Sequence, residues 1–293
     1  MSMEKTVYEE MLMRTLRTLA NGAAAAVLAF TIAPPAGAQA RSSRDVILAT
    51  TTSLNDSGLL DSLAPAFERA TGYHLRTVAV GSGQALKMGE RGDADVVFAH
   101  SPAAEQTFMA RGFGIRRLIV ATNYFTLVGP ADDPSHVRDA PSAPEALRRI
   151  AAARGVFVSR GDSSGTNARE LQLWRAAGGR PEWPGYLETG QGMSATLLVA
   201  NERRGYTLTD RSTFGALRAH LDLVPLREDE PALLNIYHVI ELNPAGRPGI
   251  NAAGGHAFAQ WLTSPETQDL IARFGTERYG APLFRAARGV EPS

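Results

Sequence analysis

From Asp45 onward, short apolar runs alternate with longer segments in which apolar residues recur at helical spacing. The helical spacing is clearest between Leu59 and Ala70, and Pro65 should kink the helix that it predicts. The apolar runs with the length of strands are residues 46–49, 74–80 and 94–99. This alternation of strands with helices predicts an α/β fold with a largely parallel sheet.

A second segment with the same alternation begins near Tyr124. Its predicted helices are residues 144–153, 168–177 and 194–202, and its predicted strands are residues 156–158, 206–208 and 221–226. The apolar stretch 233–242 is long enough to cross between two domains, and helices over 255–262 and 265–274 would then return to the first. We therefore expect residues 41–122 to begin lobe 1, residues 123–241 to form lobe 2, and residues 242–293 to complete lobe 1.

Four polar turns follow predicted strands or precede predicted helices. They are Thr50-Thr51-Thr52-Ser53, Gly81-Ser82-Gly83, the hydroxyl-rich residues 159–166, and residues 190–194. Ligands of open α/β sheets bind at the carboxyl ends of the strands, so a chain that crosses twice between two lobes would place all four turns around one cleft. Hydroxyls and the free N–H groups of a first helical turn form an uncharged anion site, although each turn alone also fits an ordinary helix cap.

Composition and charge limit the chemistry of such a site. The 293 residues are 44% hydrophobic, and Lys+Arg and Asp+Glu both number 30, so no excess of charge favours nucleic acid or an anionic membrane as a partner. Any bound anion must be held by local dipoles and one or two placed arginines. Arg117, beside the predicted crossover, could direct its guanidinium at an oxyanion, although with Arg116 it also fits an exposed pair. The absence of cysteine excludes disulfides, thiolate metal sites and a cysteine nucleophile.

The first 40 residues have the features of a secretory signal peptide. Arg14 and Arg17 precede the apolar stretch 20–33, and the small residues 36–40 provide an A-x-A cleavage site after Ala40. The apolar stretch is shorter than the roughly 20 residues that a membrane span requires. We therefore expect cleavage near Ala40 and a periplasmic protein. Because residues 1–10 are acidic for a signal peptide, Met11 and Met13 are alternative starts to Met1.

The sequence also raises one enzyme hypothesis. Residues 161–165 match the G-x-S-x-G pattern of a nucleophile elbow, which would make Ser163 the nucleophile of a secreted serine hydrolase. Such an enzyme needs a later histidine, and His220, His238 and His256 lie in no recognisable catalytic setting. The histidines also have no metal-ligand spacing, so we expect neither an enzyme nor a metal site.

Taken together, the motifs resemble the periplasmic tungstate-binding proteins of ABC importers, the TupA family, which have the type II periplasmic binding-protein fold. The segments that carry the resemblance are the run 50–53 with residues 56–60, and residues 95–102, 159–166, 206–211 and 274–284. The resemblance implies two lobes, each a mainly parallel sheet flanked by helices, with a ligand cleft between them. It also implies a monomer that needs no cofactor, binds tungstate and delivers it to an ABC transporter permease in the inner membrane, with molybdate or another oxyanion as the alternative ligand.

The resemblance further implies which residues contact the anion. They are Thr51, Thr52 and Ser53 in the first turn, Ser82 in the second, Ser164, Gly165 and Thr166 in the third, and Arg117 on the hinge side. The family commonly has histidine after Ser-Gly-Thr, where this chain has Asn167, so the role of Asn167 is left open. A tetrahedral dianion without a proton requires a site lined by donors, which agrees with the hydroxyl-rich turns. Sulfate and phosphate are smaller and phosphate carries a proton, whereas molybdate is nearly isosteric with tungstate.

Overall fold

The computed structural model describes residues 42–287, so the predicted signal peptide lies outside the described residues. The main sheet has the strand order β10-β4-β9-β3-β1-β2, and β7 and β8 pair with the second half of β4. Its strands are β1 (Asp45–Thr51), β2 (His74–Val80), β3 (Val96–Ala99), β4 (Gly114–Gly129), β7 (Thr207–Asp210), β8 (Val224–Arg227), β9 (Leu234–Leu242) and β10 (Arg285–Ala286). A separate parallel pair is formed by β5 (Phe157–Ser159) and β6 (Tyr186–Glu188).

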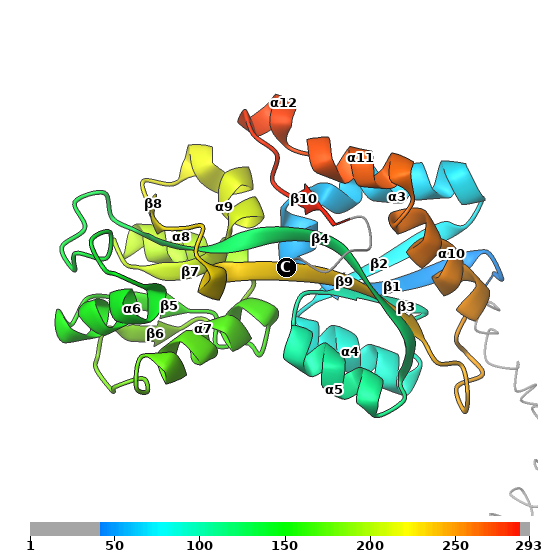
Figure 1. The fold of residues 1–293 in the computed structure, drawn as a ribbon, viewed down its shortest axis with the longest axis horizontal. Helices are drawn as coiled ribbons and strands as arrows, with labels where there is room; N and C mark the ends of the chain where they lie inside the picture. The colour runs from blue at the N-terminus through cyan, green and yellow to red at the C-terminus, as the bar shows by residue number, and fades with distance from the viewer. Residues whose placement is uncertain (1–41, 288–293) are drawn as a thin grey trace, which may run out of the picture. The chain divides into compact units, whose positions relative to one another are not determined.

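The α/β prediction is confirmed, and the sheet is mixed. β1 pairs in parallel with β2 and β3, as expected from strands joined by helices. β9 runs antiparallel to both β3 and β4, because the chain returns through it from the second lobe. The long pairing of β4 with β9 therefore joins the two halves of the molecule (Figure 1).

The helices that the sequence predicts are present within a few residues of their expected bounds, and four others, over residues 52–56, 102–110, 211–217 and 276–279, were not predicted. They are α2 (Thr52–Asp56), α3 (Leu59–Thr71), α4 (Ser82–Arg91), α5 (Pro102–Ala110), α6 (Ala143–Ala152), α7 (Gly165–Ala176), α8 (Met193–Glu202), α9 (Arg211–Leu217), α10 (Ala252–Leu262), α11 (Pro265–Arg273) and α12 (Thr276–Tyr279). Pro65 lies inside α3, which continues through it as one helix. Among residues 42–287, none of the helices is both long and apolar enough to span a bilayer.

Two crossover strands, β4 and β9, connect parts of the chain that have separate cores. We call the part built on β1, β2 and β3 lobe 1, and the part built on β5, β6, β7 and β8 lobe 2. The buried clusters of lobe 1 take their residues from 46–121 and 237–284, and those of lobe 2 from 125–233. Each lobe thus buries its own apolar surface, and the two polypeptide crossings leave room for a hinge.

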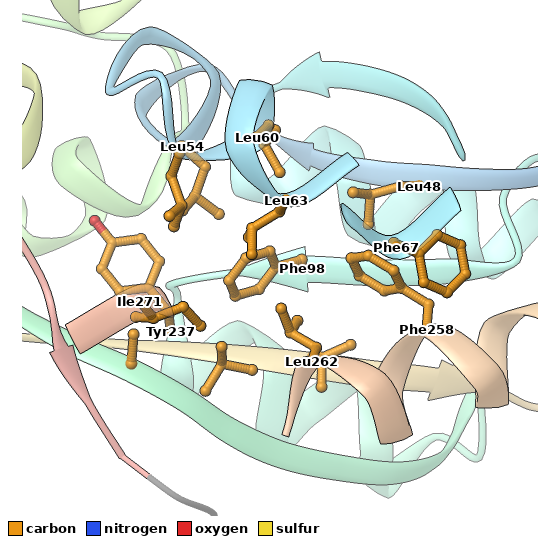
Figure 2. Close-up of a cluster of buried hydrophobic side chains, with 14 of the residues drawn as sticks. Leu48, Leu54, Leu60, Leu63, Phe67, Phe98, Tyr237, Phe258, Leu262 and Ile271 are labelled. Atoms are coloured by element: carbon orange, nitrogen blue, oxygen red, sulfur yellow. The ribbon is translucent and has the colours of Figure 1, made fainter. Parts of the chain in front are cut away.

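The main core of lobe 1 is organised around Phe67, whose side chain is fully buried (Figure 2). Its ring centroid lies 6.2 Å from that of Tyr73, 5.1 Å from Phe258 and 5.4 Å from Trp261. Aromatic pairs contribute roughly 0.5–1.5 kcal/mol beyond the area that they bury.

We expect Phe67→Leu to lower the free energy of unfolding by about 1–2 kcal/mol, measured by urea denaturation. Leu198→Ala, at an exposed site, should change it by less than about 0.5 kcal/mol, and an equal loss in both variants would contradict the prediction.

Candidate functional site

The four polar turns meet between the lobes, where the sequence predicted a cleft. The first two follow β1 and β2 of lobe 1, and the others follow β5 and β6 of lobe 2. A Cβ atom placed on Gly192 of the fourth turn would lie 3.6 Å from Thr52 Oγ1 of the first turn. A Cβ atom placed on Gly81 of the second turn would lie 3.7 Å from Ser164 Cβ of the third. These approaches show that the lobes are closed on each other at this cleft.

Each of the four turns is also the start of a helix. The N-cap residues of α2, α4, α7 and α8 are Thr51, Gly81, Ser164 and Gly192. Thr51 Oγ1 accepts from Leu54 N–H at 3.3 Å and Ser164 Oγ accepts from Asn167 N–H at 3.2 Å. The other N–H groups of a first helical turn have no intrahelical acceptor, and the positive end of the helix dipole stands behind them. The cleft is therefore surrounded by backbone donors from both lobes.

Arg160, at the end of β5, provides the only cation that reaches these turns in the hydrogen bonds of residues 42–287. Its side chain is 2% exposed. Nη2 donates to Thr52 Oγ1 across the cleft at 3.1 Å, and Nε donates to Asp162 Oδ2 at 3.1 Å. Asp162 thus neutralises and orients the guanidinium from one side. Sequence reasoning placed Arg160 in the third turn but did not identify it as a site residue.

Three buried donors beside these turns have no hydrogen-bond partner among the described residues: Ser82 Oγ from lobe 1, and Arg160 Nη1 and Thr166 Oγ1 from lobe 2. A buried donor without a partner costs roughly 1–3 kcal/mol, so three together need a common explanation. A fourth buried polar atom without a hydrogen-bond partner among the described residues is an acceptor, Glu241 Oε1. It lies 3.4 Å from Arg116, toward the other end of β3. Each of the three is a hydrogen-bond donor, so each requires an acceptor that the described residues do not supply.

Two further polar contacts join the lobes. Ser194 Oγ, in the first turn of α8, donates to Asp56 Oδ2 of α2 at 2.7 Å. Thr213 Oγ1 of α9 lies 3.5 Å from the carbonyl oxygen of Ser53. Asp56 is a carboxylate close to the cleft, and its position at the N-terminus of α8 lets the helix dipole stabilise its charge.

Buried polar contacts fix the shape of the third turn. Ser159 Oγ donates to Glu170 Oε2 at 2.6 Å and accepts from the Gly161 N–H at 3.2 Å. Tyr186 donates to the other oxygen of Glu170, also at 2.6 Å. Burial raises the pKa of Glu170, and the hydrogen bonds from Ser159 and Tyr186 oppose that rise. Glu170 of α7 thereby holds the third turn in place. The Ser159 hydroxyl is bonded to Glu170 and so points away from the cleft.

The structure brings most of the predicted site residues together. The residues found at the cleft turns are Thr51, Thr52, Ser53, Ser82, Ser164, Gly165 and Thr166. Thr50, at the end of β1, differs from them because its Oγ1 donates to the carbonyl oxygen of Phe98 at 2.8 Å inside lobe 1. Thr50 and Thr51 are thus the last residues of β1, whereas Thr52 and Ser53 are the first residues of α2.

The structure does not place Arg117 among the hydroxyls. Arg117 Nε donates to Glu105 Oε2 at 3.0 Å, and Nη2 lies 3.0 Å from His238 Nδ1. Glu105 is fully buried, and a buried carboxylate needs a cation to offset its desolvation. Arg117 supplies that charge within lobe 1, so Arg160 replaces it in the donor set proposed below.

The described residues do not assemble the serine-hydrolase arrangement considered for Ser163. Ser163 has a left-handed backbone, with φ of 58°, and its N–H donates to Asn167 Oδ1 at 3.3 Å. His238 and His256 each place Nδ1 2.9 Å from a carboxylate, on Glu105 and Glu241 respectively. Asn167 thus supports the bend of the third turn, which is the role that the sequence left open.

Comparisons with known proteins identify the family of this chain. A family model described as a PBP superfamily domain matches residues 34–266. Among curated proteins, the chain is 47% identical over 243 residues to the tungstate-binding protein TupA of Peptoclostridium acidaminophilum, a match that covers 82% of this chain and 84% of that protein. It is 40% identical over 239 residues to the TupA of Campylobacter jejuni, covering 79% and 87%.

Solved structures show the same relationship. The tungstate ABC transporter protein of Geobacter sulfurreducens is 42% identical, with a TM-score of 0.73, and the match covers 80% of this chain and 100% of that one. TupA of Desulfovibrio alaskensis G20 is also 42% identical, with a TM-score of 0.70 and coverage of 83% and 98%. The predicted family and fold are confirmed. This chain belongs to the PBP superfamily and, within it, to the TupA family.

Proposed function

We propose that this protein binds tungstate in the cleft between its lobes and delivers it to the permease of an ABC transporter. The observation that carries the proposal is the set of three buried, unpartnered donors, Ser82 Oγ, Arg160 Nη1 and Thr166 Oγ1. They come from both lobes, at turns where helices begin. An acceptor that takes hydrogen bonds from all three would relieve their desolvation, and a tetrahedral oxyanion can do so in three dimensions.

The number of available donors matches the affinity that a scavenging protein needs. Nanomolar binding corresponds to about 12 kcal/mol, and each hydrogen bond to a charged group contributes roughly 1.5–3 kcal/mol, so about six donors are required. The hydroxyls of Thr51 and Ser164 accept backbone bonds and keep their own protons to donate. With Thr52 and the three unpartnered donors they provide six, and first-turn N–H groups such as that of Gly165 add to them.

The donor set favours an anion that carries no proton. Tungstate is fully ionised at neutral pH, whereas phosphate holds a proton that needs an acceptor. The carboxylate of Asp162 is already occupied by Arg160 and by the Ser164 N–H, which lies 3.2 Å from Oδ1. Sulfate is smaller and would reach fewer donors at once. Molybdate is nearly isosteric with tungstate and is the alternative cargo.

The names of two relatives and the predicted signal peptide support a role in delivery from the periplasm. Relatives of this chain carry the names tungstate-binding protein and putative ABC transporter anion-binding protein, and the predicted signal peptide would export the protein to the periplasm. An anion that bridges both sets of turns favours the closed lobes, because only there do all donors reach it. We propose that the closed, monomeric protein docks on the inner-membrane permease and releases the anion as the lobes separate. The proposed cargo needs no cofactor and no catalysis.

A ligand panel tests this function. We expect tungstate to raise the melting temperature of the purified protein, molybdate to give an equal or smaller shift, and sulfate and phosphate to give none at the same concentration. A ligand at 1,000 times its Kd stabilises by about 4 kcal/mol, so the shift is readily measured by differential scanning fluorimetry. A larger shift with molybdate would make molybdate the cargo, and no shift with any oxyanion would overturn the proposal.

A further inference from the structure

A line of buried side chains leads from the first turn of the cleft into lobe 2. Its members, in order, are Ser53, His100, Asn235, Asn123, Ser212 and Asp210. None of the six is more than 4% exposed. Ser53 and His100 belong to lobe 1, the two asparagines are register partners on the crossover strands β9 and β4, and the last two residues belong to lobe 2.

Each neighbouring pair in this line is within hydrogen-bond reach. Ser53 Oγ lies 3.4 Å from His100 Nε2, and His100 Nδ1 lies 3.0 Å from Asn235 Oδ1. Asn235 Nδ2 lies 2.9 Å from Asn123 Oδ1. Asn123 Nδ2 lies 3.3 Å from the oxygen of Ser212, whose hydroxyl contacts Asp210 Oδ1. The line is therefore continuous through both crossover strands.

The direction of every bond is fixed from the Asp210 end. A carboxylate only accepts, and Asp210 also takes the Thr213 hydroxyl at 2.7 Å and the Thr213 N–H at 2.9 Å. Ser212 must therefore donate to Asp210, which leaves its oxygen to accept from Asn123 Nδ2. Asn123 Oδ1 then accepts from Asn235 Nδ2.

The imidazole of His100 is oriented by the same chain of bonds. Because Asn235 Nδ2 donates to Asn123 Oδ1, the amide oxygen of Asn235 faces His100, and the second proton of Nδ2 is directed to the Tyr237 hydroxyl at 2.9 Å. An oxygen there requires a proton on His100 Nδ1. Burial lowers the pKa of His100, and a neutral ring protonated on Nδ1 leaves Nε2 as an acceptor. The remaining donor for Nε2 is the Ser53 hydroxyl.

We propose that this chain of bonds holds His100 as the neutral Nδ1–H tautomer and commits the hydroxyl proton of Ser53 to His100 instead of to the bound anion. His100 and Asn235 are thus positioning residues of the first turn, and Ser53 faces the cleft with its backbone alone. The hydroxyl donors of that turn are Thr51 and Thr52. The statement about the anion rests on the proposed function, whereas the tautomer does not.

The tautomer can be measured without any ligand. The measurement is a long-range ¹⁵N–¹H spectrum of histidine-labelled protein at about pH 7.5. The peaks of His100 are assigned as those lost in His100→Gln. They should show a protonated Nδ1 and an unprotonated Nε2. Ser53→Ala removes the donor to Nε2, so it should move that nitrogen toward the shift of a free pyridine-type nitrogen. Ser82→Ala, at the same cleft but outside the line, should leave the His100 signals in place. A proton on Nε2, or an imidazolium, would overturn the proposal.

Calorimetry with tungstate then tests the consequence for binding. Ser82→Ala should weaken binding by at least about tenfold, and the loss in Ser53→Ala should be at least fivefold smaller than that. Equal losses in the two variants would return Ser53 to the donor set and contradict the inference. If the unchanged protein bound no tungstate, the proposed function would fail, and the ¹⁵N measurement would still decide the tautomer.

Discussion

Arg160→Ala is expected to weaken tungstate binding by about 10- to 100-fold. The guanidinium is buried, Nη1 has no partner within the described chain, and Nη2 reaches the cleft at Thr52. The one hydrogen bond that Nη1 can give to the anion contributes roughly 1.5–3 kcal/mol, and each 1.4 kcal/mol is a factor of ten in Kd. Among the hydrogen bonds of residues 42–287, no other cationic side chain bonds to these turns, so none replaces the charge of Arg160. Isothermal titration at fixed ionic strength measures the change.

Three other arginine variants make this result specific. Arg160→Lys keeps a charge but loses the planar fork, so it should bind at an intermediate affinity. Arg175 is exposed and lies in α7, the helix that follows the third turn. Arg175→Ala should therefore bind tungstate as the unchanged protein does. Arg117→Ala should also retain affinity, although it leaves Glu105 without its cation and should unfold more easily. Lost binding in Arg117→Ala together with retained binding in Arg160→Ala would restore the sequence-based assignment and refute ours.

The contrast between these two arginines shows where sequence reasoning ends. A hydroxyl-rich segment after a strand and before a helix is a local feature, and for this reason all four turns could be predicted. The direction of an arginine side chain depends on partners that are distant along the chain. Arg117 points to Glu105 on α5, and Arg160 is held by Asp162 after the left-handed Gly161, with φ of 59°. Neither pairing has a signature in composition or periodicity.

The crossover strands show a similar limit. Apolar runs before and after Thr122 and Asn123 predict two segments, and the structure has one strand, β4, from Gly114 to Gly129. A polar residue interrupts an apolar pattern, but it does not interrupt a strand when its side chain finds a buried partner. Asn123 has that partner in Asn235 on β9. Asn123, the polar residue that interrupts the apolar pattern, thus forms a hydrogen bond that joins β4 to β9.

Gly165→Ala is expected to remove most tungstate affinity without unfolding the protein, because it should prevent the lobes from closing. A Cβ atom at Gly165, in lobe 2, would lie 2.6 Å from the carbonyl oxygen of His100, in lobe 1, and 3.0 Å from its ring. A backbone oxygen cannot move aside as a flexible side chain can, so the lobes must stay apart. The anion then loses the donors of one lobe, and two lost bonds weaken Kd by at least about 100-fold.

The stability of the ligand-free variant separates blocked closure from misfolding. Gly165 is the first residue of α7, where alanine favours the helix by up to about 1 kcal/mol, so the melting temperature should stay the same or rise. Small-angle scattering should also show that tungstate no longer compacts the variant. A melting temperature that falls by ten degrees or more would mean that the contact with His100 is needed for folding itself.

Two other glycines at the cleft complete a graded series. A Cβ atom at Gly83 would lie 3.2 Å from the carbonyl oxygen of Ser163, a tight contact that a small shift relieves, whereas one at Gly192 would lie 3.6 Å from Thr52, an ordinary contact. Tungstate affinity should therefore fall most in Gly165→Ala, by about tenfold in Gly83→Ala, and by less than about threefold in Gly192→Ala. Because the three changes add the same methyl group, an order that follows the distances would identify closure as the step on which binding depends. Equal losses in all three variants would instead point to direct contact with the anion.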